Sequence, residues 1–243
     1  MIQVEQLYKS FGAITAVENV SFTAADGMIT GLLGPNGAGK STTMRLIAGV
    51  LQPEQGQIHV NQYNVSVQRV EAQQQLGVLA DSRGLYHRLT ARENIRYYGR
   101  LRGLKGNDLE QRIDQLITLL DMDDIAERRT EGFSTGQKVK VAIARILVHG
   151  PQNVILDEPT SGLDVMATRA MRDVIRRLRD EGSCVLLSSH IMQEIAALCG
   201  HIVIIANGRI KMQGSPDELR QRTERENLED AFVSAIGSTE GLE

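Results

Sequence analysis

Residues 34–41 read GPNGAGKS, and this stretch constrains the fold more than any other part of the chain. It fits the phosphate-loop pattern G-x-x-x-x-G-K-[ST] at every fixed position, after an apolar run at 29–33 and before a helix-like segment at 42–49. Its glycines let successive backbone N–H groups point at phosphate oxygens, and the following helix directs its positive dipole end at the same anion. Lys40 is expected to reach the β- and γ-phosphates, and the Ser41 hydroxyl to bind Mg²⁺. The sequence therefore predicts a nucleoside triphosphate site, made by Gly34, Pro35, Asn36, Gly37, Ala38, Gly39, Lys40, Ser41 and Thr42.

The composition is that of an ordinary globular protein. Of the 243 residues, 42% are hydrophobic and 23% charged, and the net charge of −3 gives no sign of a nucleic-acid-binding surface. The first ten residues contain no apolar signal core, and no run approaches the roughly 18 apolar residues of a membrane span. Cys184 and Cys199 match no zinc or redox spacing, so we expect buried free thiols. These features together predict a cytoplasmic location.

The order of the predicted elements indicates an α/β fold with a helical insert. Strand-like alternation opens the chain, and apolar strands are expected at 29–33, 76–80, 153–157, 184–188 and 202–205. Between about 81 and 150 the apolar spacing becomes helical, and Thr90 and Glu93 form a predicted capping box. Asn207-Gly208 predicts a hairpin, and Ser215 is expected to cap a final helix. From 221 onward the charged tail is expected to be a loosely packed helix with a frayed end.

Two acids and a histidine stand at the ends of predicted strands. The strand at 153–157 is apolar throughout, as in a parallel sheet buried on both faces, and it ends in Asp157 and Glu158. Asp157 suits Mg²⁺, and Glu158 is the candidate to orient or deprotonate an attacking water. His190, just beyond the strand at 184–188, is either a γ-phosphate contact or a surface histidine. Phe11 either stacks on an adenine ring or packs in the core, and its position alone does not decide between them.

Further motifs follow in a fixed order, and they resemble the ATP-binding cassette (ABC) ATPases. The segment FSTGQ at 133–137 is similar to the ABC signature motif; after it come a Walker B strand at 154–157 with Glu158, a D-loop SGLD at 161–164, and His190 at the switch-histidine position. The resemblance covers about residues 1–215. It implies the P-loop NTPase fold of ABC ATPases: a RecA-like core, an N-terminal antiparallel β-subdomain and an α-helical subdomain.

The resemblance also assigns roles to single residues. It implies that Phe11 stacks on adenine, that Glu158 is the catalytic base, and that His190 senses the γ-phosphate. It further implies a head-to-tail homodimer in which each ATP lies between one P-loop and the partner's signature residues, here Ser134, Gly136 and Gln137. Isolated monomers are therefore expected to be poor ATPases.

The chain departs from the family pattern at two places. Phe133 and Thr135 replace the commoner Leu and Gly of the signature motif. More consequentially, Asp81 stands where the family usually has the Q-loop glutamine; a carboxylate can still face Mg²⁺, but it lacks the amide donor, so coupling to a membrane partner is the property affected. The stretch 81–95 is similar to the ATPase subunits of sodium-extruding exporters of the NatA type, which work with a separate permease of the ABC-2 class.

The sequence thus predicts the cytoplasmic ATPase subunit of an ABC exporter, bound peripherally at the cell membrane of a bacterium or archaeon. Its cofactors are ATP and Mg²⁺, with Ser41, Asp81 and Asp157 as metal-site residues, and its partners are a second ATPase domain and an integral-membrane permease, not nucleic acid. The expected parts are an ATP-binding core with the β-subdomain (1–80 and 151–215), a helical subdomain (81–150) and a helical tail (216–243). A groove around residues 81–103 is expected to receive the permease. Three alternatives stay open: export of a drug, lipid or polysaccharide instead of Na⁺, a non-transport ABC ATPase, and a regulatory subunit that hardly hydrolyses ATP.

Overall fold

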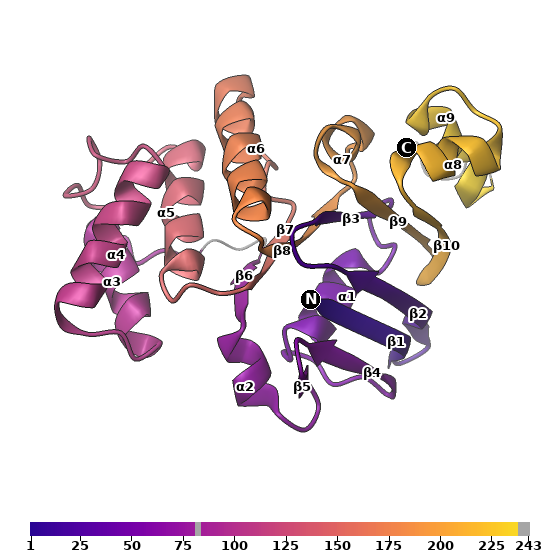
Figure 1. Ribbon diagram of the computed structural model, residues 1–243, viewed down its shortest axis with the longest axis horizontal. Helices are drawn as coiled ribbons and strands as arrows, with labels where there is room; N and C mark the ends of the chain where they lie inside the picture. Colours follow the sequence, from indigo (N-terminus) through magenta and orange to yellow (C-terminus); the bar gives the residue numbers. More distant parts are fainter. Residues whose placement is uncertain (81–83, 238–243) are drawn as a thin grey trace.

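The computed structural model describes residues 1–80 and 84–237, and in this part of the chain two β-sheets pack around helix α1 (Figure 1). The smaller sheet is antiparallel with the strand order β2-β1-β4-β5, and the larger sheet has the order β10-β9-β3-β8-β7-β6. The strands of the smaller sheet are β1 (Ile2–Phe11), β2 (Ile14–Ala24), β4 (Gln55–Val60) and β5 (Tyr63–Asn64). Those of the larger sheet are β3 (Ile29–Leu33), β6 (Leu76–Leu79), β7 (Asn153–Asp157), β8 (Cys184–Ser189), β9 (His201–Ala206) and β10 (Arg209–Gly214).

The larger sheet is parallel except at β10, which forms a hairpin with β9. Every residue of β3, β7 and β8 is buried, as their unbroken apolar runs require, because layers cover both faces of these central strands. One hydrophobic cluster lies between this sheet and the helices, and a second lies between the two sheets. Because β3, β8 and β7 are parallel neighbours, their carboxyl ends lie at the same edge of the sheet.

The helices α3, α4 and α5 form a group at one side of the larger sheet (Figure 1). Helix α3 begins with the predicted capping box, in which the Thr90 side chain accepts a hydrogen bond from the Glu93 backbone N–H. The helices are α1 (Lys40–Ile47), α2 (Arg69–Gln74), α3 (Ala91–Leu101), α4 (Gly106–Leu119), α5 (Thr135–Leu147), α6 (Val165–Asp180), α7 (Met192–Leu198), α8 (Pro216–Thr223) and α9 (Leu228–Ile236).

The predicted elements are confirmed, with small shifts in their limits. The phosphate-loop helix begins at Lys40, two residues before its predicted start, and ends at Ile47. The hairpin at Asn207-Gly208 is present, with both residues at positive φ (51° and 72°). The tail differs from the expectation: helix α9 buries Ala231 to 1% exposure and packs against β9, so it is attached to the core.

Both cysteines are buried free thiols, as predicted. Within residues 1–80 and 84–237, no helix combines the length and the apolar character that crossing a bilayer requires. The fold class expected from the sequence, an α/β core with an antiparallel sheet and a helical group, is the one observed.

Candidate functional site

The phosphate loop connects the end of β3 to the start of α1, as the sequence predicts. Gly37 and Gly39 have φ values of 79° and 103°, which L-residues rarely adopt. At Gly39 the space is also filled, because an added Cβ would lie 2.4 Å from the carbonyl oxygen of Ala16 in β2. The loop is therefore held from behind by the smaller sheet, and its backbone conformation depends on glycine at these positions.

Lys40, the first residue of α1, is buried with its ammonium group at the centre of the loop. Its Nζ donates to the carbonyl oxygens of Gly34 (2.7 Å) and Pro35 (3.0 Å), and it lies 3.9 Å from Glu158 Oε1. Burial lowers the pKa of Lys40, although the charges of Glu158 and Asp157 partly oppose this effect. A cation surrounded by carbonyl oxygens and carboxylates is suited to accept phosphate oxygens in their place.

Asp157 and Glu158 follow each other at the end of β7, and Ser188 of the neighbouring strand β8 fixes both. The Ser188 hydroxyl donates to Asp157 Oδ1 (2.6 Å) and accepts from the Glu158 backbone N–H (3.0 Å). Glu158 has φ 47°, a left-handed conformation that is unfavourable for a residue with a side chain and is typical of functional sites. The turn at Glu158 directs the two acids into different surroundings: Asp157 is 8% exposed, whereas the Glu158 side chain is 22% exposed.

His190 meets Glu158 across the ends of β7 and β8. Its Nδ1 lies 2.9 Å from Glu158 Oε2, and its side chain is 44% exposed. The structure therefore brings together three of the predicted residues, since Glu158 contacts both Lys40 and His190. An isolated surface histidine, the other interpretation, does not describe this arrangement.

The residues predicted to hold Mg²⁺ fit that ion in donor chemistry. Ser41 in the first turn of α1 supplies a hydroxyl, and Asp157 supplies a carboxylate. Among the described residues there is no cluster of three or more His, Cys, Asp or Glu side chains that could hold a metal by itself. Mg²⁺ bound with a nucleotide needs no such cluster, because phosphate oxygens and water complete its shell. Asp81, the third predicted metal-site residue, lies outside the described residues.

The predicted signature residues lie at the start of α5. Ser134 caps this helix: its hydroxyl accepts from the Gln137 backbone N–H (3.2 Å), and the Gln137 side chain accepts from the Ser134 N–H (3.1 Å). A Cβ added to Gly136 would lie 3.3 Å from Cβ of Ala167 in α6, so this glycine permits close approach of the two helices.

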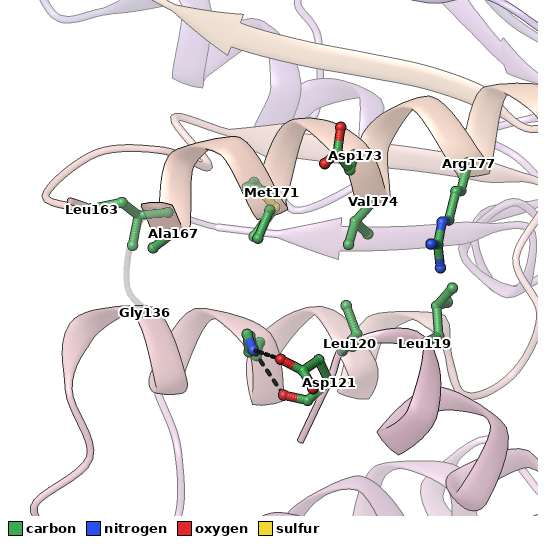
Figure 2. A pocket seen from close by; sticks show the side chains of 12 residues that line it. Leu119, Leu120, Asp121, Gly136, Leu163, Ala167, Met171, Asp173, Val174 and Arg177 are labelled. Carbon is green, nitrogen blue, oxygen red and sulfur yellow. Dashed lines mark hydrogen bonds and ion pairs between the residues drawn. The ribbon is translucent and has the colours of Figure 1, made fainter. Parts of the chain in front are cut away.

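A cavity of about 200 Å³ continues along the same joint between α5 and α6 (Figure 2). Leu119, Leu163 and Met171 supply part of its apolar lining, and an ion pair between Lys140 and Asp121 (3.6 Å) stands at its side. The signature glycine and the predicted D-loop leucine, Leu163, thus line one cavity where the helical group meets the core. Packing along this joint is incomplete.

Phe11 ends β1 and is 49% exposed, with Lys9 Nζ 5.6 Å from its ring centroid. The interpretation as a core residue is therefore wrong. Phe11 lies on the β1–β2 hairpin, and Ala16 of β2 contacts Gly39 of the phosphate loop. The exposed ring is therefore available for stacking on a base.

Sequence reasoning missed four polar residues beside the predicted ones: Ser188, Thr160, Ser189 and Glu194. Ser188 ties Asp157 to Glu158, while Thr160 and Ser189 donate their hydroxyl hydrogens to one buried acid, Glu194. The available signal was a polar residue at the end of an apolar strand, as at Ser188. Which carboxylate it meets depends on the pairing of β7 with β8, in which Asp157 lies opposite Ser188.

The fold and this constellation are those of the ABC ATPases, and the comparisons with known proteins agree. The family model of the ABC transporter matches residues 17–161, well over half of the chain. A solved structure described as the ATP-binding subunit of an ABC transporter superposes with a TM-score of 0.89 at 30% sequence identity, covering 97% of this chain and 99% of that one. The protein belongs to the ABC transporter ATP-binding family, and it is an ATP-binding ATPase domain.

Two curated relatives are similar over nearly the whole chain. The ABC transporter ATP-binding protein NatA of Bacillus subtilis (strain 168) is 42% identical over 224 residues, which is 92% of this chain and 91% of NatA. The linearmycin resistance ATP-binding protein LnrL of the same organism is 34% identical over 236 residues, which is 97% of this chain and 76% of LnrL.

Proposed function

We propose that this protein is the nucleotide-binding subunit of an ABC exporter, in which Glu158 activates the attacking water and His190 contacts the γ-phosphate. The observation that carries the proposal is the contact of Glu158 with both His190 (2.9 Å) and Lys40 (3.9 Å) beside the phosphate loop. A carboxylate between a phosphate-binding lysine and a histidine is placed where a water attacking the terminal phosphorus has to be oriented.

Each group has a distinct task in this scheme. Lys40 exchanges the Gly34 and Pro35 carbonyl oxygens for phosphate oxygens, and Glu158 accepts a hydrogen bond or a proton from water. With Nδ1 of His190 at Glu158, the second ring nitrogen is left to contact the γ-phosphate. Ser41 and Asp157 would hold Mg²⁺, which when bound neutralises phosphate charge.

The proposed homodimer completes the site with the partner's Ser134, Gly136 and Gln137. It is supported by exposed apolar side chains directly after the predicted D-loop: Val165 is 83% exposed and Met166 74% exposed, both in the first turn of α6. Apolar side chains of this size are expected to be covered when a second copy binds. The ATPase rate per molecule should therefore rise with protein concentration.

A groove in the helical group is the proposed docking place for the permease. Leu85, Tyr86, Leu89 and Tyr97 supply its apolar lining, and His87 and Arg88 its polar lining. Three buried or half-buried polar groups hold its loop: Asn94 and Thr130 bond to Tyr86, and Arg145 donates to the Gly84 carbonyl (2.8 Å). A short amphipathic helix on the cytoplasmic side of a permease fits such a rigid aromatic groove.

This docking is tested by co-purification with a candidate permease of the same organism. Tyr97→Glu places a charge in the groove and should abolish co-purification, whereas Leu101→Glu, at an exposed position of the same helix outside the groove, should not. Equal binding by both variants would place the permease elsewhere.

For the transported substrate we propose Na⁺, because NatA is the more similar of the two relatives described. The similarity to LnrL supports a second candidate, export of an antibiotic-like molecule. ATP-driven ²²Na⁺ uptake into inside-out vesicles containing this subunit and its permease tests the first. Absence of uptake together with drug-stimulated ATPase activity would favour the second.

The proposed chemistry is tested with Glu158→Gln. The amide keeps the size of the side chain but cannot take up the proton, so this variant should bind ATP and dimerise while hydrolysis falls by about a hundredfold or more. Hydrolysis at the wild-type rate would show that Glu158 is not the base. The proposed location, the cytoplasmic face of the membrane, is tested separately by the co-purification with the permease.

A further inference from the structure

Glu194 is a buried acid that has no role in the function proposed above. It lies on α7 and is 6% exposed. Its Oε2 accepts two hydrogen bonds, from the hydroxyls of Thr160 (2.6 Å) and Ser189 (3.1 Å). Within residues 1–80 and 84–237 it forms no ion pair. Because a buried carboxylate without partners is costly, these two bonds determine where the Glu194 side chain sits.

The two hydroxyl donors stand on either side of the contact between Glu158 and His190. Thr160 is two residues after Glu158, and Ser189 directly precedes His190. Ser189 Oγ also accepts from the Ile191 N–H (2.9 Å), so both neighbours of the histidine are tied. Contacts and chain together form a closed ring. Glu158 contacts His190, and Thr160 and Ser189 both donate to one oxygen of Glu194. The backbone joins Glu158 to Thr160 and Ser189 to His190.

The sheet alone does not fix this geometry. The paired register of β7 and β8 ends at Asp157 and Ser188, before either of the two residues that touch. Beyond that pair the chain after β7 leaves the sheet, whereas β8 continues for one residue to Ser189, which lies opposite Leu33 of β3. The position of Thr160 relative to His190 therefore depends on contacts outside the β7–β8 pairing. The shared acceptor of Thr160 and Ser189 supplies such a link.

Helix α7 gives Glu194 a rigid support. It packs on β3, the strand that leads to the phosphate loop, through a glycine: a Cβ at Gly31 would lie 2.7 Å from Cys199 Sγ and 2.8 Å from Ile195 Cδ1. Ile195, next to Glu194, is completely buried. The acid is thus anchored to the same strand that positions Lys40.

We propose that Glu194 is a positioning residue for ATP hydrolysis, which holds Thr160 and Ser189 so that Glu158 and His190 stay aligned. The inference rests on the roles proposed above for Glu158 and His190. Glu194 does not touch the reacting atoms; it acts on the distance and orientation of the groups that do. Because misplacement of a catalytic group by about 1 Å can cost about a hundredfold in rate, loss of this link is expected to lower kcat rather than ATP affinity.

The test uses the whole chain at one fixed, high protein concentration with ATP and Mg²⁺. Glu194→Ala should lower kcat about tenfold or more, with KM for ATP within about twofold of wild type. Glu194→Gln, whose amide oxygen can accept both hydroxyl hydrogens, should restore most of kcat. Thr160→Val removes one donor at equal size and should lower kcat in the same direction. Rates are taken per folded molecule, determined by denaturant unfolding.

Two comparisons separate positioning from a purely structural role. If Thr160 and Glu194 act through one bond, the double variant Glu194→Ala/Thr160→Val should be no more than about twofold slower than Glu194→Ala. Glu218→Ala removes another glutamate that accepts from a serine, in the capping box of α8, and should leave kcat unchanged. Fully multiplicative losses in the double variant, equal kcat for Glu194→Ala and wild type, or no rescue by Glu194→Gln would each overturn the inference.

The same assay separates this inference from the proposed function. If Glu158→Gln and His190→Ala abolish hydrolysis while Glu194→Ala keeps the wild-type kcat, only the positioning role is wrong. If Glu158→Gln and His190→Ala hydrolyse ATP normally, the proposed roles fail and the positioning role fails with them.

Discussion

The hydroxyl of Ser188 holds two functional groups at once, and Ser188→Ala is the perturbation with the clearest expected result. The substitution removes the donor to Asp157 Oδ1 (2.6 Å) and the acceptor of the Glu158 N–H (3.0 Å). Ser188 is completely buried, so no bulk water replaces its hydroxyl. Both remaining partners lose a hydrogen bond inside the protein.

The magnitude follows from these two bonds. A hydrogen bond to a carboxylate contributes about 1.5–3 kcal/mol, and leaving a buried N–H unpaired costs about 1–3 kcal/mol. Because the two partners are consecutive residues, the losses overlap, and we expect the free energy of unfolding to fall by about 3 kcal/mol. Glu158 also loses an anchor for its left-handed backbone (φ 47°), so kcat should fall about ten- to hundredfold.

Ser21 offers a matched control within the same chain. Its hydroxyl accepts from the backbone N–H of Gln6 (2.7 Å), and Gln6 also has φ 47°. This bond is solvent-exposed and lies in the smaller sheet, so Ser21→Ala should cost about 1 kcal/mol or less and leave kcat unchanged. Urea unfolding and steady-state ATPase assays measure both quantities. Equal stability losses in the two variants, with kcat of Ser188→Ala within twofold of wild type, would refute the reasoning.

Three further predictions concern other parts of the chain. Burial lowers the pKa of His149 to about 4, so as the pH falls this histidine is protonated in the unfolded chain first. The free energy of unfolding should therefore drop by about 2 kcal/mol between pH 6.5 and pH 4. In urea titrations, His149→Gln should make this dependence on pH weaker. Burial raises the pKa of Cys184 to about 11 and that of Cys199 further, so both thiols should resist a disulfide reagent at pH 8 and react only after unfolding; fast labelling of the native protein would contradict their burial. Thr90→Ala removes the cap of α3 and should lower Tm by about 2–4 °C in a calorimetric scan, and an unchanged Tm would show that the cap is dispensable.

Local patterns in the sequence predicted much of this site. The phosphate loop, the acids after β7 and His190 after β8 were all found from short stretches, because strand ends and glycine-rich turns have local signatures. Phe11 shows the limit of such reasoning: its two interpretations differ only in exposure, and exposure depends on which parts of the chain pack over it. The tail was underestimated for the same reason, since the fit of α9 onto β9 has no local signal.

The sequence by itself determined the family, the α/β fold and the kind of ligand, because each follows from residue types at fixed short spacing. Only the tertiary structure decided which polar groups hold the site. Ser188 meets Asp157 through the pairing of two strands separated by a whole helix. Glu194 of α7 accepts from Thr160 in the loop after β7 and from Ser189 at the end of β8. Such contacts depend on strand register and helix packing, which are properties of the assembled sheet and are absent from any single stretch of the chain.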